Sequence, residues 1–494
     1  MSLYEKLKQI KGKSVVVAGA GISGISACKF LETLGANIVL VDDADLELIQ
    51  KRIASSGGIP ACVSLQQGIK SSITLQAELI ILSPGISKNH VAIQEALAHS
   101  IPVINELDLG AAFLTSCHFV GITGTNGKST TATILGFIAK AFDANAFVGG
   151  NLGIPLCETL VKGVLPKIAV LELSSYQLEL LELLRLDAGV ITNLTPDHLD
   201  RYPNVEAYYL AKAKIFDLLH TTGSAILNHE DPNSKIFLLD HAAHPRLDFN
   251  VKLGDQGIAI KGNTLLINTP TLQATLTLNQ EQFLGQHNYQ NAAAAVAAAL
   301  ALNIPLAIIQ KGLDSYTGIA HRLESLGYAQ GIRWVNDSKA TNVESVLIAM
   351  QNFSEGVHLV VGGLGKNSSY APLVNFCQGR VNAIYAIGQD APNLMEAFKD
   401  FVCFDAKTLE NAVLLAQKNA QKGDTILLSP ACASWDQFES FAHRGDSFRK
   451  LFEEAKASSL RTKVKQSRAK KRLDCHVTNV PHSDDTGAYK GKRK

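Results

Sequence analysis

A glycine-rich stretch, GITGTNGKST at residues 121–130, most constrains what this chain can fold into. An apolar run at 118–120 precedes it, and a helical pattern at 131–140 follows it. A strand, a glycine turn and a helix that begins with Lys128 and Ser129 are typical of a phosphate-binding loop, because glycines let backbone N–H groups surround anionic oxygens. We expect Lys128 to contact the terminal phosphates of a nucleotide and Ser129 to bind Mg²⁺.

The loop departs from the usual G-x-x-x-x-G-K-[ST] spacing. Ile122 occupies the place of the first glycine, and Gly121 and Gly124 flank it. A glycine turn that only joined a strand to a helix would not require Lys-Ser at the start of the helix. The sequence therefore indicates a variant phosphate-binding loop, TGTNGKST.

The chain is too long for one ordinary domain, because 494 residues with 46% hydrophobic content can form several large cores. Its formal net charge of +1 conceals an asymmetry: residues 456–494 hold 12 Lys or Arg and 3 Asp or Glu, so the remainder is mildly acidic. An acidic body argues against nucleic acid as its partner. The basic tail lacks hydrophobic periodicity, and we expect it to be disordered, with no partner assigned.

The eight cysteines are scattered and form no C-x-x-C pair, so no zinc site is expected. They fit the reduced thiols of a cytosolic protein. The longest apolar run, 292–302, is far shorter than the roughly 18 residues that a membrane span needs. No signal peptide is recognisable. We therefore expect a cytoplasmic protein without a membrane span.

The N-terminal region has the pattern of a Rossmann-like unit. A strand at 14–18 is followed by the G-x-G-x-x-G turn at 19–24, a helix, and a strand at 38–41 that ends in Asp42. This pattern predicts a nucleotide at the helix N-terminus, with a carboxylate near its ribose or base. A dinucleotide is the usual ligand of such a turn, and a nucleotide-sugar is the less common one.

The central region carries several polar residues near strand ends. Glu172 lies at the end of a buried strand, where a carboxylate fits a Mg²⁺ ligand. His198 follows the next strand, and its position makes it a candidate ligand or catalytic group. Residues 205–219 have an amphipathic helical pattern, and from the pattern alone Lys212 and Lys214 belong to its solvated face.

An alanine-rich helix begins after GQHNYQN at residues 285–291. Asn288 and Asn291 lie one helical turn apart, so that both amides can face one ligand; Asn288 can equally cap the helix. Further along, strands at 333–335, 358–361 and 425–428 each end in a polar or glycine loop, which predicts another nucleotide-type sheet.

Charged residues of the third region are expected to converge at the edge where these strands end. A basic cluster there can hold an anionic substrate or a developing phosphoryl charge. The residues are Arg322, Asp337, Lys339 and Lys366.

Seven motifs in one order carry a family resemblance: GITGTNGKST, LELSSYQLE, NLTPDHLDRY, GQHNYQN, HRLE, NDSKATN and LSPACASWDQF. They resemble the motifs of the Mur ligase family, over residues 1–455. The resemblance implies an α/β fold of three domains. These would be a Rossmann-like UDP-binding domain at 1–106, a central P-loop ATPase-type domain at 107–318 and a C-terminal Rossmann-like amino-acid-binding domain at 319–455, followed by the basic tail.

The resemblance also implies an activity. An ATP-dependent ligase would add D-glutamate to UDP-N-acetylmuramoyl-L-alanine through an acyl phosphate, a step in cytoplasmic peptidoglycan precursor synthesis. The cofactors would be ATP and two Mg²⁺ ions, and the protein would be a monomer. The first domain would then bind uridine diphosphate and not NAD.

The site residues that the resemblance implies fall into five groups. ATP would be bound by Gly124, Thr125, Asn126, Gly127, Lys128, Ser129, Thr130, Asn288, Asn291, Arg322 and Asp337. The UDP-substrate would be bound by Ile22, Ser23, Asp42, Gly85, Asn151, Ser174, Gln177 and His198. D-Glutamate would be bound by Thr341, Lys366, Ser434 and Phe441. The catalytic residues would be Lys128, His198, Lys212 and Lys339. The metal ligands would be Ser129, Glu172, His198 and a carbamylated Lys212.

Carbamylation would turn the Lys212 cation into the anionic oxygen ligand that Mg²⁺ prefers. Lys214 is the alternative for this role. The sequence departs from the family pattern at two places: no arginine closely follows Asp42 and Asp43, and Trp435 stands where a leucine is common.

Other functions leave motifs unexplained. A sister ligase for a different amino acid is the nearest alternative, but SPACASWDQF and the absence of a D-N-P-R motif favour D-glutamate. A dinucleotide-dependent oxidoreductase would not use the phosphate-binding loop. A GTPase-like switch would need an N-K-x-D motif, which we do not find. A binding-only protein would have no use for Glu172 or for the segment 336–339.

Overall fold

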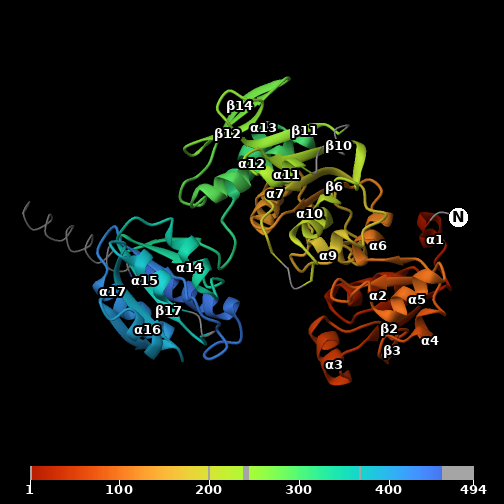
Figure 1. Ribbon diagram of the computed structural model, residues 1–494, viewed down its shortest axis with the longest axis horizontal. Coiled ribbons are helices and arrows are strands. Elements are labelled where there is room, and N and C mark those ends of the chain that lie inside the picture. Colours follow the sequence, from red (N-terminus) through yellow and green to blue (C-terminus); the bar gives the residue numbers. More distant parts are fainter. Residues whose placement is uncertain (1–2, 198–200, 237–243, 366–368, 459–494) are drawn as a thin grey trace, which may run out of the picture. The chain divides into compact units, whose positions relative to one another are not determined.

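The computed structural model describes residues 3–197, 201–236, 244–365 and 369–458. They form two compact units, one ending at Gly318 and one beginning at Ile319 (Figure 1). His198, Lys366 and residues 459–494 of the basic tail lie outside the described residues, whereas residues 456–458 are helical, so the predicted disordered tail begins too early. In the described part of the chain, no helix has both the length and the apolar character needed to cross a membrane.

The first unit begins with a parallel five-stranded sheet of order β3-β2-β1-β4-β5. Its strands are β1 (Ser14–Ala18), β2 (Asn37–Asp42), β3 (Ser64–Gln67), β4 (Leu79–Leu82) and β5 (Val103–Ile104). Its helices are α1 (Leu3–Lys8), α2 (Ile22–Thr33), α3 (Leu46–Ser55), α4 (Ser71–Thr74), α5 (Val91–Ala98) and α6 (Glu106–Phe113).

Strand β1 is buried on both faces, as expected for a parallel sheet covered by helices. Val15 and Val17 pack in one hydrophobic cluster with residues of α2, and Val16 packs in another with residues of α5. All three valines are no more than 1% exposed. Helix α6 is held to the central part of this unit by Asp108, whose carboxylate accepts hydrogen bonds from the backbone N–H groups of residues 182–184 at 2.9 Å.

The same unit contains a nine-stranded sheet of order β14-β13-β12-β11-β10-β9-β6-β8-β7. Its strands are β6 (His118–Thr123), β7 (Phe147–Gly150), β8 (Ile168–Glu172), β9 (Leu186–Ile191), β10 (Leu219–Asn228), β11 (Arg246–Val251), β12 (Gly257–Lys261), β13 (Thr264–Thr269) and β14 (Leu272–Thr277). The strands from β7 to β12 pair in parallel, whereas β13 and β14 are antiparallel additions at one edge.

Small side chains bring the helices of this region close together. The helices are α7 (Lys128–Phe142), α8 (Cys157–Val161), α9 (Ser175–Leu178), α10 (Val205–Ala213), α11 (Pro232–Ile236), α12 (Gln286–Ala301) and α13 (Leu306–Ser315). The run of alanines in α12 is buried against α7 and the sheet. Gly312 of α13 lies so close to α7 that a Cβ there would meet the Cα of Ile138 at 2.4 Å.

The second unit has a six-stranded sheet of order β15-β16-β20-β17-β18-β19, in which only β15 is antiparallel to its neighbour. Its strands are β15 (Glu324–Ala329), β16 (Ile332–Asn336), β17 (Val357–Gly362), β18 (Val381–Ile387), β19 (Cys403–Lys407) and β20 (Thr425–Leu428). Its helices are α14 (Val343–Met350), α15 (Ala371–Cys377), α16 (Ala391–Ala397) and α17 (Leu409–Asn419), with a further helix over 441–458. Trp334 packs against Phe448 and Phe452 of this last helix.

Candidate active site

The phosphate-binding loop joins β6, in the interior of the nine-stranded sheet, to α7. Two of its glycines have positive φ, +140° at Gly124 and +84° at Gly127. A Cβ at Gly124 would meet the Oγ1 of Thr192 at 2.0 Å, and one at Gly127 would meet the Oδ1 of Asn291 at 2.4 Å. The loop therefore needs glycine at both places, for its backbone conformation and for space.

Two lysines converge on this loop. The Nζ of Lys128 donates to the carbonyl oxygens of Gly124 and Thr125, at 2.7 and 2.8 Å. The Nζ of Lys212, which comes from α10, donates to the same Gly124 oxygen at 2.9 Å. Lys212 is only 2% exposed. Burial, and then the positive charge of Lys128, lower the pKa of Lys212 to about 7.

The surface position that the helical pattern predicts for Lys212 is wrong, whereas Lys214 is exposed as predicted. Helix α10 ends at Ala213, and Leu219 already belongs to strand β10, so the predicted helix over 205–219 is too long. Lys212 is buried because the phosphate-binding loop covers it, which the local pattern does not reveal.

The segment after β9 holds the phosphate-binding loop in place. The side chain of Asn193 accepts from the backbone N–H of Asn126 at 2.9 Å and donates to its carbonyl oxygen at 3.0 Å. The hydroxyl of Thr192 donates to the same carbonyl, and Thr125 donates to the carbonyl of Thr195 at 3.0 Å. No role for Thr192, Asn193 or Thr195 was predicted from the sequence, although their position shortly after a strand was an available signal.

Glu172 lies at the end of β8, with only 2% of its surface exposed. Its Oε1 accepts a hydrogen bond from the side chain of Asn151 at 2.8 Å. Its Oε2 has no hydrogen-bond partner within the described residues. A buried carboxylate oxygen without a donor is unfavourable unless it meets a cation. The residue therefore fits an oxygen ligand of Mg²⁺, and Ser129, in the first turn of α7, adds a hydroxyl of the type that such loops use.

The two candidate asparagines of α12 have different surroundings. Asn291 is 9% exposed, lies against Gly127, and accepts a hydrogen bond from Thr131 at 3.3 Å. Asn288 instead donates to the carbonyl of Leu284, at 2.7 Å, near the start of its own helix. Asn291 thus lies at the loop. The prediction that Asn288 caps the helix is wrong: Gly285 is the N-cap residue, without a side-chain hydrogen bond, and Asn288 donates to a carbonyl where a cap would accept from a backbone N–H. Of the other loop residues named from sequence, Thr130 is buried.

The residues predicted for the nucleotide-sugar lie at the carboxyl ends of β1, β2 and β4. Asp42 accepts hydrogen bonds from the backbone N–H groups of Ala20, at 2.7 Å, and Ala44, at 2.8 Å. Arg52 lies 3.5 Å from Asp42, so an arginine does accompany this acid, from α3 and not from the adjacent sequence. Ile22 is 57% exposed beside the glycine turn. Ser23 and Gly85 complete the set at this edge.

Ser174 and Gln177 form a capping box at the start of α9. The Ser174 hydroxyl accepts from the backbone N–H of Gln177, and the Gln177 Oε1 accepts from that of Ser174 at 3.0 Å. Nearby, the guanidinium of Arg201 lies 3.8 Å from the ring centre of Tyr176 and pairs with Glu179 at 3.1 Å. The capping box orients both predicted side chains.

In the second unit, the structure brings Arg322, Asp337 and Lys339 together. The Asp337 carboxylate accepts from the backbone N–H of Leu323 at 3.1 Å and from the hydroxyl of Ser429 at 2.7 Å. The backbone N–H of Lys339 donates to the carbonyl of His321 at 2.9 Å. Burial raises the pKa of Asp337 to about 7. His321 and Leu323, on either side of Arg322, have positive φ values of 63° and 43°, an uncommon backbone that these contacts hold.

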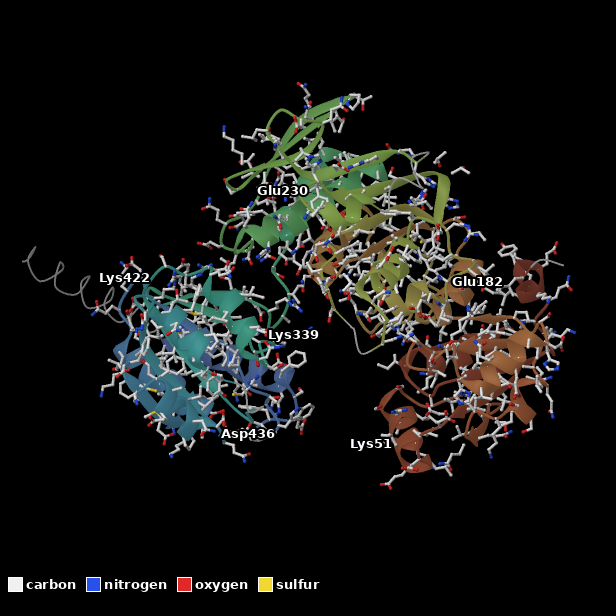
Figure 2. The ribbon with its side chains drawn as sticks, viewed as in Figure 1. Lys51, Glu182, Glu230, Lys339, Lys422 and Asp436 are labelled. Atoms are coloured by element: carbon white, nitrogen blue, oxygen red, sulfur yellow. The ribbon has the colours of Figure 1, made fainter. Side chains whose placement is uncertain are left out.

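Of the residues predicted for the amino acid, Thr341 and Ser434 lie on loops of this unit and Phe441 begins its last helix, whereas Lys366 is outside the described residues. Thr341 follows Lys339, whose Nζ lies 5.6 Å from the ring centre of Phe441. Ser434 is buried in the loop after β20, and the adjacent Trp435 is 69% exposed. Asp436 of the same loop accepts from the backbone N–H of Gln389 at 2.8 Å. Lys339 and Asp436 are labelled in Figure 2.

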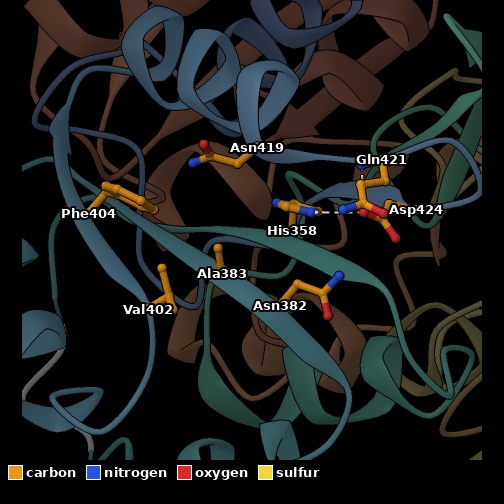
Figure 3. A pocket seen from close by; sticks show the side chains of 8 residues that line it. All are labelled: His358, Asn382, Ala383, Val402, Phe404, Asn419, Gln421 and Asp424. Carbon is orange, nitrogen blue, oxygen red and sulfur yellow. Dashed lines mark hydrogen bonds and ion pairs between the residues drawn. The ribbon is translucent and has the colours of Figure 1, made fainter.

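A separate cavity of about 400 Å³ lies at the amino ends of the strands in this unit. It is lined by His358, Asn382, Ala383, Val402, Phe404, Asn419, Gln421 and Asp424 (Figure 3). His358 contacts Asp424 at 3.1 Å and the hydroxyl of Tyr385 at 2.9 Å, and burial lowers the pKa of its imidazole. Ligands of such sheets bind beyond the carboxyl ends of the strands, so this cavity is not part of the candidate active site.

Three family models match the chain. They are the Mur ligase MurD-like N-terminal domain at residues 13–105, the Mur ligase middle domain at 122–299 and the Mur ligase glutamate ligase domain at 321–432.

Relatives and solved structures agree with these matches. The UDP-N-acetylmuramoylalanine–D-glutamate ligase of Myxococcus xanthus is 39% identical, over 90% of this chain and 99% of its own. The ligase of the same name from Anaeromyxobacter dehalogenans is 38% identical, over 90% of this chain and 98% of its own. The MurF ligase of Thermotoga maritima in complex with ADP shares the fold with a TM-score of 0.53 and 16% identity, over 93% and 100% of the two chains. The chain belongs to the Mur ligase family.

Proposed function

We propose that this protein is an ATP-dependent ligase that joins D-glutamate to UDP-N-acetylmuramoyl-L-alanine, in the synthesis of peptidoglycan precursors in the cytoplasm. The observation that carries the proposal is the arrangement around the phosphate-binding loop. There Lys128, the buried carboxylate of Glu172 and the buried Lys212 lie around a loop that would hold a nucleotide's phosphates. Relatives named for this reaction, at 38–39% identity, support the choice of substrates.

The chemistry explains why such a site is needed. A carboxylate is a poor acyl donor, because its leaving group would be oxide. In the proposed reaction a carboxylate oxygen of the alanyl end attacks the γ-phosphorus of ATP, and ADP leaves. The amine of D-glutamate then attacks the carbonyl carbon of the acyl phosphate, inorganic phosphate leaves, and the amine loses a proton. Phosphoryl transfer of this kind depends mainly on positioning and charge neutralisation.

In this proposal the loop residues 124–130 hold the phosphates of ATP, and Lys128 neutralises their charge. Asn291 orients the nucleotide from α12, and Asn288 acts with it from the start of the same helix. Arg322 and Asp337 also bind ATP, and Lys339 acts on the reacting groups. Positive charge placed where phosphoryl charge develops lowers the barrier.

Two Mg²⁺ ions are proposed, and the donor set fits them. Ser129 and the partnerless oxygen of Glu172 would hold the first, and His198 with a carbamylated Lys212 would hold the second. A neutral amine is the form that reacts with CO₂, and the lowered pKa of Lys212 provides it near neutral pH. The bound ions would supply charge neutralisation at the phosphates.

The remaining proposed contacts belong to the other two substrates. Those for the UDP-substrate are Ile22, Ser23, Asp42, Gly85, Asn151, Ser174, Gln177 and His198. Those for D-glutamate are Thr341, Lys366, Ser434 and Phe441. We propose the domain limits given above and a monomer.

The test is ATP-dependent phosphate release by purified protein with Mg²⁺ and UDP-N-acetylmuramoyl-L-alanine. D-Glutamate, L-alanine, L-lysine and meso-diaminopimelate are supplied one at a time. Release with D-glutamate alone, and its loss in Lys128→Ala, supports the proposal. Release with a different amino acid keeps the family and overturns the choice of D-glutamate. No release with any of them, from folded protein that binds ATP, overturns the ligase proposal.

A further inference from the structure

Arg444 is a fully buried arginine in the first turn of the helix over 441–458. Its guanidinium makes six hydrogen bonds, and every acceptor is a neutral oxygen. Within the described residues, no salt bridge involves it. Burial lowers the pKa of this guanidinium to about 10, which leaves it charged at neutral pH. Asp436 interacts with this charge electrostatically, but no carboxylate of the described residues accepts a hydrogen bond from it. Such a buried cation is expensive to maintain, so the fold keeps it against a free-energy penalty.

The acceptors come from three loops, each at the carboxyl end of a strand. After β16, Ser338 contributes its hydroxyl and its carbonyl, both at 2.9 Å. At the end of β17, the carbonyl of Gly362 lies at 3.4 Å. After β20, Cys432 contributes its carbonyl at 3.2 Å to both terminal nitrogens, and Ala433 lies at 3.5 Å. One planar side chain thus links three segments that are far apart in the sequence.

These loops carry residues that the proposed function assigns to D-glutamate. Thr341 follows Ser338 on the first loop, and Ser434 follows Ala433 on the last. A fourth connection reaches Phe441, because the hydroxyl that accepts from Arg444 also donates to the Phe441 carbonyl at 2.8 Å. Arg444 itself has no exposed surface, so it cannot touch a substrate.

We propose that Arg444 is a positioning residue for the amino-acid substrate: it fixes the spacing of the loops that bind D-glutamate and adds positive charge beneath them. The inference rests on the proposed function. The guanidinium of Arg444 has five N–H donors in one rigid plane, which can bond several carbonyls at once. A lysine ammonium cannot reproduce this arrangement. The hydrogen bonds of Arg444 go to neutral groups, and the part of its charge that the nearby Asp436 carboxylate does not offset can attract the two carboxylates of the substrate.

A purely structural role predicts something different. Loss of a buried residue that only supported the core would lower the melting temperature and change the KM values of all substrates in parallel. A positioning role predicts that the KM for D-glutamate changes most, because all three loops that Arg444 contacts carry proposed D-glutamate residues, whereas only the loop after β16 carries a proposed ATP contact, Asp337. ATP has most of its proposed contacts, and the UDP-substrate all of them, in the first unit.

The experiment measures the three KM values, kcat and the melting temperature of Arg444→Lys, Arg444→Met and Ser338→Ala in the full-length protein. Arg449→Lys is the matched control, since Arg449 lies on the same helix but pairs with Glu324 at 2.7 Å near the surface. We expect Arg444→Lys to raise the KM for D-glutamate about tenfold or more, with the other KM values within about twofold, because small misplacements of binding groups have large effects. Ser338→Ala should show a smaller shift in the same direction.

Binding is also followed without turnover. Trp334 is buried and Trp435 is exposed beside Ser434, so a change in tryptophan fluorescence on adding D-glutamate reports on this loop. The titration midpoint should rise in Arg444→Lys and stay unchanged in Arg449→Lys.

Unchanged D-glutamate binding in folded Arg444→Lys, or parallel changes in all three KM values, overturns the inference. If the Arg444 variants do not fold, the same KM values and the same D-glutamate titration of Ser338→Ala decide whether the inference stands. Failure of the wild-type protein to use D-glutamate would instead contradict the proposed function, and it would be visible before any variant is made.

Discussion

Lys128 and Lys212 donate hydrogen bonds to the same carbonyl oxygen, that of Gly124, at 2.7 and 2.9 Å. Two ammonium groups on one acceptor repel each other, and the repulsion favours the neutral form of the more buried one. That group is Lys212, whose pKa falls to about 7, first through burial and then through Lys128. The neighbouring Lys214 is exposed and provides a natural comparison.

We predict that Lys212 takes up CO₂ as a carbamate and that Lys214 does not. After incubation with ¹³C-bicarbonate at pH 8, a carbamate carbon should be visible by ¹³C NMR in the wild-type protein and in Lys214→Ala. It should be missing from Lys212→Ala. Turnover should fall by roughly 100-fold or more in Lys212→Ala, because a charge-placing group is lost, and should be nearly unchanged in Lys214→Ala. A carbamate signal that persists in Lys212→Ala would contradict the prediction.

Gly127 should tolerate no side chain, because a Cβ would lie 2.4 Å from the Oδ1 of Asn291. We expect Gly127→Ala to weaken ATP binding at least about tenfold through displacement of Asn291 or of the loop. Gly163→Ala is the control, since Gly163 also has positive φ but has no atom within 4 Å of the added Cβ. Isothermal titration measures the ATP affinity of both variants, and thermal unfolding measures their stability. Gly163→Ala shows the effect of backbone strain alone, and Gly127→Ala shows strain together with the clash. Equal losses of ATP affinity would argue against this explanation.

Asp42 should be more important for the N-terminal turn than Arg52 is. The two carboxylate oxygens of Asp42 each accept a hydrogen bond from a backbone N–H, one from Ala20 and one from Ala44. In Asp42→Asn, one of these oxygens becomes an NH₂ group, which cannot accept, so only one of the two hydrogen bonds can remain. We expect a loss of about 1–3 kcal/mol in the free energy of unfolding, together with weaker binding of UDP. Arg52→Gln removes a long, partly exposed contact at 3.5 Å and should change stability by less than about 1 kcal/mol. Urea unfolding and UDP titration test both, and a larger effect at Arg52 would refute the ranking.

The contribution of His358 to the stability of the second unit should fall as the pH drops below the usual imidazole pKa of 6.5, whereas the raised pKa of Asp337 acts in the opposite direction. The folded-state pKa of His358 is lowered by burial, so the unfolded chain takes up the proton first. The loss should begin near pH 6.5 and grow down to the folded-state pKa. We predict that His358→Gln flattens this dependence in urea unfolding between pH 7.5 and 5.5, whereas His443→Gln, at an exposed position, leaves it intact. An unchanged slope in His358→Gln would exclude this residue as the cause.

The sheets were largely predictable from local pattern. The predicted strands at 14–18 and 425–428 coincide with β1 and β20, because each is a short apolar run between turn residues and is buried on both faces. Strands β18 and β19 were not predicted. The helix predicted at 205–219 ends at Ala213, because the chain turns there to enter β10.

The positions of single charged side chains were much less predictable. Lys212 and Lys214 have the same local pattern, and only the phosphate-binding loop, 88 residues away in the sequence, distinguishes them. Arginine is usually a surface residue, so the sequence gives no sign that Arg444 is buried. Its hydrogen-bond acceptors lie as far as 106 residues away in the sequence. Such burial is a property of tertiary packing, which local spacing does not encode. Arg52 illustrates the same limit, because α3 brings it to Asp42 from outside the motif.

The contacts of Asn193 have a consequence for the thermodynamics of nucleotide binding. Both backbone polar groups of Asn126 are already hydrogen-bonded to this one side chain, so the turn has its shape before any phosphate arrives. A free loop would have to give up conformational entropy on binding, at about 1–2 kcal/mol for each residue that becomes fixed. Here that loss has occurred during folding. Affinity for the nucleotide is therefore set in part by an amide that need not touch it.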